Sequence, residues 1–206
     1  MTFIKICGIT NLADALVAVD AGADALGFNF YRPSPRYIEP NAAREIIDQL
    51  PREVMKVGVF VNEPTPESVM EIVRRTGIGA VQLHGDESPD YCRALAASYV
   101  IKVLAAGDDF ELNSVLAYEV DAIMLDARHE QLRGGTGQVI DWSLAKKVTE
   151  LSTRLFLAGG LSPENVAEAI SAVKPYAVDA CSALEVVPGK KNHAQVREFI
   201  YAVRHV

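Results

Sequence analysis

The most constraining feature of this sequence is an alternation that repeats eight times. Short runs of apolar and β-branched residues alternate with longer stretches in which apolar residues recur at helical spacing. Parallel strands joined by crossover helices produce this pattern, and continuous apolar runs are typical of strands buried on both faces. The predicted strands are Phe3–Cys7, Ala25–Phe30, Lys56–Val61, Ala80–Leu83, Val100–Leu104, Ala122–Leu125, Leu155–Ala158 and Ala177–Ala180. The predicted helices are Asn11–Ala21, Asn41–Gln49, Pro66–Arg75, Pro89–Ala97, Phe110–Ala117, Trp142–Leu151, Pro163–Ala172 and His193–Arg204.

A weak internal repeat favours closure of this sheet into a barrel. A small or acidic residue before Ala or Val introduces several strands, as in Ala23-Asp24-Ala25 and Val178-Asp179-Ala180. The alternative, an open doubly wound sheet, usually carries a GxGxxG turn after its first strand, and none is present here. A length of 206 residues is within the range of (β/α)₈ barrels. The sequence therefore predicts an α/β protein, a TIM (β/α)₈ barrel, as a single domain over residues 1–206.

Composition narrows the possible partners and location. Half of the residues are hydrophobic, so a sizeable core can be buried. The net charge of −7 argues against nucleic acid and anionic membranes as main partners. The N-terminus does not resemble a signal peptide, and no apolar run is long enough for a membrane helix. Cys7, Cys92 and Cys181 are odd in number and lack CxxC spacing, which indicates free thiols in a reducing cytoplasm. The histidines show no metal-ligand spacing, so no metal site is predicted.

In a barrel of this kind, functional groups collect where the strands end. Cys7 ends the first strand and could act as a base or nucleophile, or pack as a small apolar group. Asp126 ends the sixth strand, where a carboxylate is costly to bury unless it is paired, and it could also cap the following loop. The positions at strand ends are Cys7, Asn29 to Arg36, Asn62, Gln82 to Asp86, Lys102, Asp126, Gly159-Gly160 and Cys181 to Ala183.

Three of the connecting loops carry further candidates. Prolines frame Arg36, whose guanidinium suits a carboxylate or a phosphate, although a solvated basic turn would look similar. Gly159 and Gly160 precede a predicted helix with Ser162 as its N-cap, which is typical of a phosphate site after the seventh strand. The second half of that site would come from Ser182 and Ala183.

Two more segments remain candidates on weaker grounds. His84 could be an acid–base group or a hydrogen-bonded structural residue, and it is included among the substrate-binding candidates. Residues 127–141 contain three glycines and no strong helical period, so we expect a lid over the substrate with glycine hinges.

Taken together, the motifs resemble those of phosphoribosylanthranilate isomerases. They occur in order from residue 5 to about residue 191, and the combination of K-I-C-G-I-T with Q-L-H-G-D-E is the most specific part. The matching segments are Lys5 to Thr10, Gly27-Phe28, Pro33 to Tyr37, Val57 to Asn62, Val81 to Glu87, Leu125-Asp126, Gly134 to Gly137, Leu157 to Leu161, Pro163 to Val166 and Pro188 to Lys191.

The resemblance implies an activity and a set of roles. The family carries out an Amadori rearrangement of N-(5′-phosphoribosyl)anthranilate in tryptophan biosynthesis, without metal or organic cofactor. By match to its motifs, Asp126 is expected to be the general acid and Cys7 the general base. Arg36 is expected to bind the anthranilate carboxylate. The cradle for the phosphate is expected to consist of Gly159, Gly160, Ser182 and Ala183. The expected partner is a small phosphosugar, with no nucleic acid or membrane, and the chain is expected to be a monomer or a homodimer.

This chain departs from the usual family pattern at three positions. Cys181 stands where a serine is usual, and Ala183 replaces a glycine beside the expected phosphate. Alanine would be strained there if the site required a positive φ. Asn192 replaces an aspartate after P-G-K-K.

Two alternatives remain open on the sequence alone. One is another phosphosugar barrel enzyme, such as the histidine-pathway aminoaldose isomerase, which ordinarily has aspartate where this chain has Cys7, or a ribulose-phosphate epimerase. The other is a barrel that binds a phosphosugar without catalysis, which the presence of both Cys7 and Asp126 disfavours.

Overall fold

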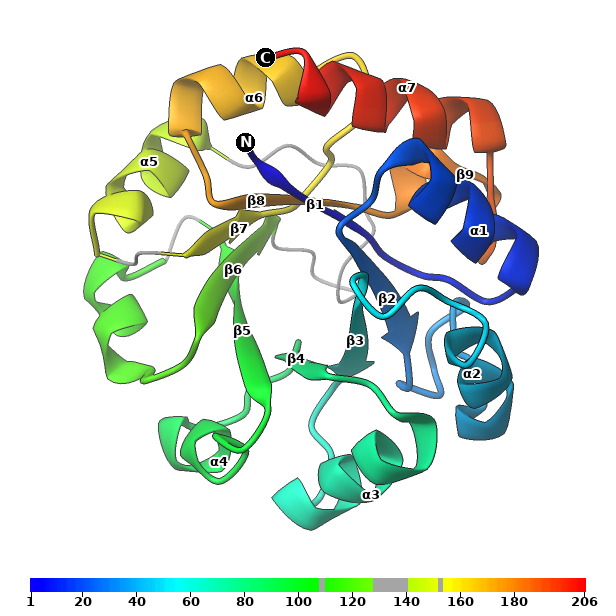
Figure 1. Ribbon diagram of the computed structural model, residues 1–206. Helices are drawn as coiled ribbons and strands as arrows, with labels where there is room; N and C mark the ends of the chain where they lie inside the picture. The colour runs from blue at the N-terminus through cyan, green and yellow to red at the C-terminus, as the bar shows by residue number, and fades with distance from the viewer. Residues whose placement is uncertain (108–109, 128–140, 152–153) are drawn as a thin grey trace.

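The eight predicted strands form one closed parallel barrel in chain order, with the helices around its outside (Figure 1). The structure, a computed structural model, describes residues 1–107, 110–127, 141–151 and 154–206. The predicted TIM barrel is therefore confirmed, whereas the expected lid lies mostly outside the described residues. The barrel strands are β1 Phe3–Ile6, β2 Ala25–Asn29, β3 Met55–Phe60, β4 Ala80–Leu83, β5 Tyr99–Ala106, β6 Ala122–Ala127, β7 Leu155–Leu157 and β8 Ala177–Ala180.

The pairing of β1 with β8 closes the barrel and sets its internal layers. Phe3 pairs with Ala177 and Lys5 pairs with Asp179. Because side chains alternate between the two faces of a strand, residues two apart point to the same side. The floor of the interior is an apolar cluster, and the polar side chains on the same face lie one or two layers above it. This cluster consists of Ala25, Val57, Ala80, Ile101, Val103, Ala122, Met124, Phe156, Ala158 and Ala177.

Helices with recognisable ends cover the outer face of the barrel. The helix α3 begins after Thr65, which forms a capping box with Ser68, and ends at Gly77 in the left-handed conformation. Asn192 caps α7 by accepting from the amides of Ala194 and Gln195, so the replacement of aspartate there keeps a functional cap. The helices are α1 Leu12–Ala21, α2 Pro40–Ile47, α3 Pro66–Thr76, α4 Pro89–Arg93, α5 Trp142–Leu151, α6 Val166–Val173 and α7 His193–Arg204.

The predicted start of α6 was wrong. The helix begins at Val166 with Asn165 in the cap position, rather than at Pro163 after Ser162. The Asn165 side chain folds back on the loop, where Oδ1 accepts from the amide of Ser162 and Nδ2 donates to the carbonyl of Gly160. These bonds keep residues 162–165 in a turn before the helix.

Several other segments differ from the sequence prediction. Residues Leu112–Ala117 form a 3₁₀ helix, η1, in place of an α-helix, and α4 is shorter than expected. After β8 the chain makes a second 3₁₀ turn, η2 Ser182–Leu184, and then an antiparallel hairpin of β9 Glu185–Val187 and β10 Lys190–Lys191. This hairpin was not predicted because its strands are too short to show a periodicity. No helix among the described residues is long and apolar enough to cross a membrane.

Candidate active site

The strand ends bring together several of the predicted site residues at the mouth of the barrel. Cys7 follows β1 and donates its backbone amide to the carbonyl of Ala180, which continues the β1–β8 pairing beyond the last strand residues. Asp126 lies in β6 and contacts His84, which follows β4. Cys7 and His84 lie one layer above Lys5 and Gln82 on their own strands, whereas Asp126 lies one layer above Met124 of the apolar floor.

The Cys7 thiol is buried beside two lysines and a second thiol. A hydrogen bond from Cys181 lowers the pKa of Cys7 well below its ordinary value; burial opposes this, and the charges of Lys5 and Lys191 reinforce it. The same bond, together with burial, raises the pKa of Cys181 well above its ordinary value. Cys7 is therefore the thiolate of the pair, and a thiolate is the form able to take a proton from carbon.

Glycine at position 27 makes room for this arrangement. A Cβ atom there would lie 2.7 Å from the Cys7 Sγ and 3.2 Å from the Lys5 Nζ. Any larger residue would push the thiolate and the ammonium group out of place.

A buried ion pair lies directly beneath Cys7. The Lys5 Nζ donates to the Asp179 Oδ1 at 2.7 Å, and the Lys5 side chain has no exposed surface. Burial raises the pKa of Asp179 to about 6, although Lys5 acts in the opposite direction. Burial works against the charge on Lys5, but Asp179 and Cys7 outweigh it and raise the Lys5 pKa. Lys5 therefore stays cationic and stabilises the thiolate above it.

The shift at Cys7 predicts an unusual pH dependence of alkylation. The thiolate is fully formed above its lowered pKa and is lost only as the pH falls through that pKa. We expect the rate of iodoacetamide modification at Cys7 to be nearly constant from about pH 7 to about pH 9, whereas an ordinary thiol accelerates roughly twentyfold. Stopped samples digested and read by mass spectrometry give the rate at each cysteine.

The other two cysteines are internal references in that experiment. Burial raises the pKa of Cys92 to about 11, and the pKa of Cys181 is also raised, so both should react slowly at neutral pH. A rate at Cys7 that climbs with pH like that of free cysteine would contradict the assignment of a thiolate.

Asp126 is buried, and its carboxyl group has a backbone donor and an imidazole ring as neighbours. Its Oδ1 accepts from the amide of Ala127 at 2.9 Å, and its Oδ2 lies 3.2 Å from the His84 Nε2. The other ring nitrogen of His84, Nδ1, lies 3.2 Å from the Gln82 Nε2. His84 is thus a neighbour of the carboxyl group, which favours an acid–base role over a purely structural one.

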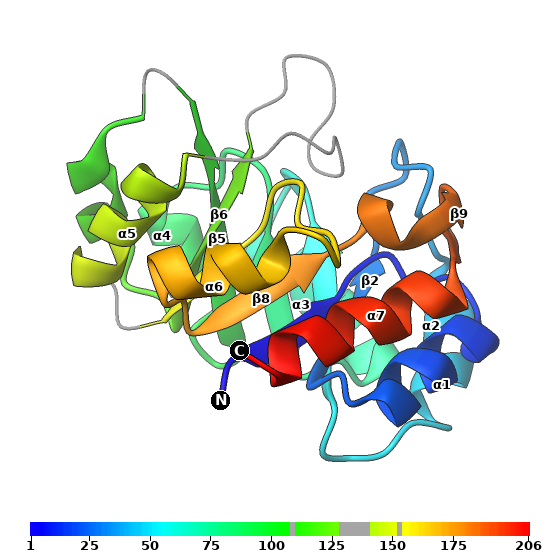
Figure 2. The ribbon, with the colours of Figure 1, turned by 90° about the horizontal axis from the view of Figure 1, so that it is seen from above.

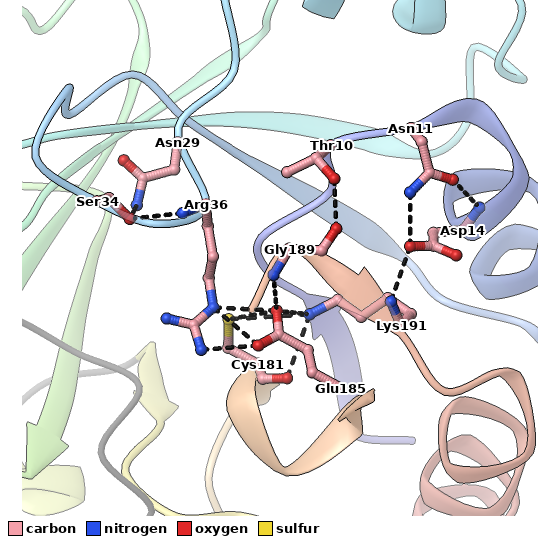
Figure 3. Close-up of polar contacts among 10 residues, drawn as sticks. All are labelled: Thr10, Asn11, Asp14, Asn29, Ser34, Arg36, Cys181, Glu185, Gly189 and Lys191. Carbon is pink, nitrogen blue, oxygen red and sulfur yellow. Dashed lines mark hydrogen bonds and ion pairs between the residues drawn. The ribbon is translucent and has the colours of Figure 1, made fainter. Parts of the chain in front are cut away.

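The loop after β2 holds Arg36 in a defined position (Figure 3). The Asn29 Nδ2 donates to the Ser34 Oγ, and that hydroxyl accepts from the Arg36 amide at 3.2 Å. The guanidinium group of Arg36 donates from Nε and Nη2 to the carboxylate of Glu185, with an Nη2–Oε2 distance of 2.7 Å. Within the described residues Nη1 donates no hydrogen bond, so this edge remains able to bind an anion.

Glu185 connects Arg36 to the hairpin (Figure 3). Its side chain is only 3% exposed, and it accepts from the Lys191 Nζ at 3.0 Å and from the Gly189 amide at 3.3 Å. Burial favours the neutral acid, but the bonds from Arg36 and the charge of Lys191 outweigh it and lower the pKa of Glu185. The carboxylate therefore stays ionised and neutralises the two cations.

The hairpin is also anchored to the first βα unit. Asp14 on α1 accepts from the amide of Lys191 at 2.8 Å and contacts the His193 Nε2 at 2.8 Å, and Thr10 donates to the carbonyl of Gly189. In two views the hairpin lies beside the start of α7 (Figures 1 and 2).

The expected phosphate cradle lies on the loops after β7 and β8. Gly159 and Gly160 have φ angles of 80° and 69°, which residues with a side chain rarely adopt. Ala183 is part of η2 and is not among the described residues with positive φ, so the replacement of glycine there introduces no backbone strain.

Sequence reasoning assigned no role to four polar residues of this site. The period-two spacing places Lys5 on the same strand face as Cys7, and the same spacing from Ala177 could have placed Asp179 in the barrel. Glu185 and Lys191 depend on a short hairpin that the sequence pattern does not predict. No group of three or more His, Cys, Asp or Glu residues in the described part of the chain is placed to hold a metal ion.

Comparison with known proteins gives a consistent result over the whole chain. A family model described as N-(5′phosphoribosyl)anthranilate (PRA) isomerase matches residues 4–202. The N-(5′-phosphoribosyl)anthranilate isomerase of Trichlorobacter lovleyi is 49% identical over 200 residues, covering 97% of both chains. The phosphoribosyl anthranilate isomerase of Thermotoga maritima has a solved structure that matches with a TM-score of 0.93 at 43% identity, covering 100% of both chains. A further structure of this kind, in complex with reduced 1-(o-carboxyphenylamino)-1-deoxyribulose 5-phosphate, matches with a TM-score of 0.90 at 42% identity, again covering 100% of both chains.

A thiolate and a buried carboxyl at the mouth of one closed barrel define a (β/α)₈-barrel enzyme of the acid–base type. Within that class, the chain belongs to the N-(5′-phosphoribosyl)anthranilate isomerase family.

Proposed function

We propose that this protein converts N-(5′-phosphoribosyl)anthranilate into 1-(2-carboxyphenylamino)-1-deoxyribulose 5-phosphate, an aldose-to-ketose isomerisation in tryptophan biosynthesis. The observation that carries this proposal is the pairing of a stabilised thiolate at Cys7 with a buried carboxyl at Asp126 on one barrel mouth. An Amadori rearrangement needs one acid and one base on the same sugar.

The first chemical step belongs to Asp126. The protonated carboxyl donates its proton to the ring oxygen of the ribose, the bond between C1′ and that oxygen breaks, and a cationic C1′=N Schiff base forms. Asp126 is left as a carboxylate, which the His84 Nε2–H can stabilise across 3.2 Å.

The second step belongs to Cys7. Its thiolate takes the proton from C2′, and the electron pair of that bond forms C1′=C2′ while the nitrogen becomes neutral. The enol at C2′ then becomes a ketone as its hydroxyl releases a proton to solvent and C1′ takes one up from solvent, which gives the product. Exchange with solvent moves the proton held by the Cys7 thiol back to the Asp126 carboxylate, so both groups return to their starting states. Lys5 and Lys191 hold the base in its ionised form until the C2′ proton is transferred.

Two anion sites fix the substrate between these groups. Arg36 is assigned to the anthranilate carboxylate through Nη1, which donates no hydrogen bond within the described residues, and His84 is assigned to the sugar between the two ends. The phosphate is assigned to the loops that carry Gly159-Gly160 and Ser182-Ala183. Holding both ends of an opened sugar keeps C2′ within reach of Cys7.

Isotope exchange tests this mechanism directly. Turnover in D₂O should place one deuterium on the C1′ methylene of the product, because the proton that C1′ receives comes from groups that exchange with solvent. The position and content of deuterium are read by proton NMR and mass spectrometry. Product without deuterium would contradict the exchange of this proton with solvent and would indicate direct transfer of the C2′ hydrogen to C1′.

A change at Glu185 should weaken substrate binding. We expect Glu185→Gln to raise KM by about tenfold while kcat changes less than about threefold, because Arg36 loses the charge that fixes it but the acid and base remain. Steady-state kinetics with the natural substrate measure both constants.

Asp14→Asn is the matched control for that variant. It weakens the anchor of Lys191 and the hairpin without touching Arg36, so it should lower Tm and leave KM near the wild-type value. An equal rise in KM in both variants would mean that Glu185 only holds the hairpin in place.

We also propose that residues 1–206 act as one catalytic domain in the cytoplasm, as a monomer or homodimer. The continuous closed barrel and the acidic net charge of −7 support this, with a small phosphosugar as partner and no role for nucleic acid or membrane.

A further inference from the structure

Gln82 is a polar residue inside the barrel that the proposed chemistry does not use. It lies on β4, two residues beyond Ala80 of the apolar floor and two residues before His84. Its side chain therefore shares the interior face with both. The residue is 1% exposed, so its amide is shielded from water.

The amide of Gln82 is linked to the general acid through one imidazole ring. The Gln82 Nε2 lies 3.2 Å from the His84 Nδ1, and the His84 Nε2 lies 3.2 Å from the Asp126 Oδ2. The three side chains form a continuous line from the barrel interior to the mouth.

The backbone next to His84 is held firmly. The Lys102 Nζ donates to the carbonyl of Gly85 and to the Glu87 Oε2, both at 2.7 Å. The Gly85 amide in turn donates to the Glu87 carboxylate. These bonds hold the backbone on the C-terminal side of His84 in place.

The Gln82 Oε1 is buried and has no hydrogen-bond partner among the described residues. A buried polar atom without a partner is unfavourable, and an apolar side chain of similar shape would avoid that cost. Barrel stability alone does not account for glutamine at this position.

The two orientations of this amide match the two protonation states of Asp126. When the Gln82 Nε2 donates to the His84 Nδ1, the imidazole carries its proton on its own Nε2, which faces the Asp126 Oδ2 at 3.2 Å and suits an ionised carboxylate. When the amide is turned, the Gln82 Oε1 accepts from a protonated His84 Nδ1. The His84 Nε2 then carries no proton and can accept the proton of a neutral Asp126 carboxyl. Each orientation leaves one end of the amide without a partner among the described residues.

We infer that Gln82 is a positioning residue for the general acid: its amide sets the tautomer of His84, and His84 holds Asp126 in the protonation state that each step requires. This inference rests on the proposed isomerase activity. It assigns to Gln82 a part in proton transfer that it performs without touching the substrate.

A double-mutant cycle on kcat tests the inference. Gln82→Met removes the amide and keeps a similar shape, and it should lower kcat about tenfold with KM changed less than about twofold. In a His84→Asn background, the same change should have no further effect, because the link to Asp126 is already broken. Met124→Leu, in the apolar floor, is the control for repacking and should leave kcat and KM near wild type.

The possible outcomes separate this inference from the proposed function. A tenfold loss in kcat that disappears in the His84→Asn background, with Tm unchanged or raised, supports it. Undiminished kcat in Gln82→Met, the same loss in both backgrounds, or a loss confined to KM overturns it. Absence of turnover by the wild-type protein would instead refute the proposed function.

Discussion

Replacing Cys7 by alanine is expected to lower kcat by about three orders of magnitude, with KM changed less than about threefold. The thiolate acts on the C2′ proton only in the transition state, so its loss should leave ground-state binding largely intact. Steady-state kinetics by substrate fluorescence, with an active-site titration to confirm folded protein, measure the effect.

Cys92→Ala provides the matched control for the loss of a thiol. Cys92 is buried on α4, and burial raises its pKa to about 11, so it has no part in the chemistry. We expect kcat within about twofold of wild type for this variant. Near-normal turnover of Cys7→Ala would show that another group is the base.

Replacing Asp126 by asparagine is expected to lower kcat by about two to three orders of magnitude. The amide keeps the shape of the carboxyl but supplies no acidic proton for the ring oxygen, so ring opening should become limiting. The effect should fall on kcat, because Asp126 occupies neither of the two proposed anion sites. Rapid-quench measurement of the open-chain intermediate locates the slowed step.

Asp20→Asn, on the exposed face of α1, is the control for loss of one negative charge, and its kcat should stay near wild type. If Asp126→Asn retained most of its turnover, or lost activity only through KM, the assignment of Asp126 as the acid would fail.

The hydrogen bond between the Cys7 and Cys181 thiols shows what cysteine does at position 181, where serine is usual in the family. A serine hydroxyl could also donate to a thiolate at Cys7, so the hydrogen bond does not require cysteine. The structure places Cys181 within reach of Lys191 and Glu185 as well, with Sγ–Nζ and Sγ–Oε1 distances of 3.8 and 3.9 Å. The substitution therefore keeps a donor at this position, and the Cys7→Ala result should not depend on it.

Sequence reasoning identified the barrel because hydrophobic periodicity is a local property of each strand and helix. The structure contains all eight predicted strands, and the comparisons confirm the protein family that the motifs resemble. The boundaries of predicted helices were wrong where side chains form hydrogen bonds to the backbone of a neighbouring loop. Asn165 delays the start of α6 by bonding to Gly160 and Ser162, and such a contact is not visible in a periodic pattern.

The candidate site was predictable to the extent that strand ends define it. Cys7 and Asp126 were found by position, whereas their surroundings depend on contacts between distant segments. Lys5 meets Asp179 across 174 positions, and Arg36 meets Glu185 across 149. The roles assigned to the individual residues remain predictions for the variants described above.

The most direct test of the central proposal is turnover of freshly generated N-(5′-phosphoribosyl)anthranilate by the purified protein. Loss of substrate fluorescence would be followed without added metal and again with a chelator, beside the Cys7→Ala variant. We predict fast turnover that resists the chelator and is nearly abolished in the variant. No turnover by the wild-type protein, with phosphate or the reduced product analogue still binding, would contradict the proposal and indicate a barrel that binds without catalysis or acts on another phosphosugar.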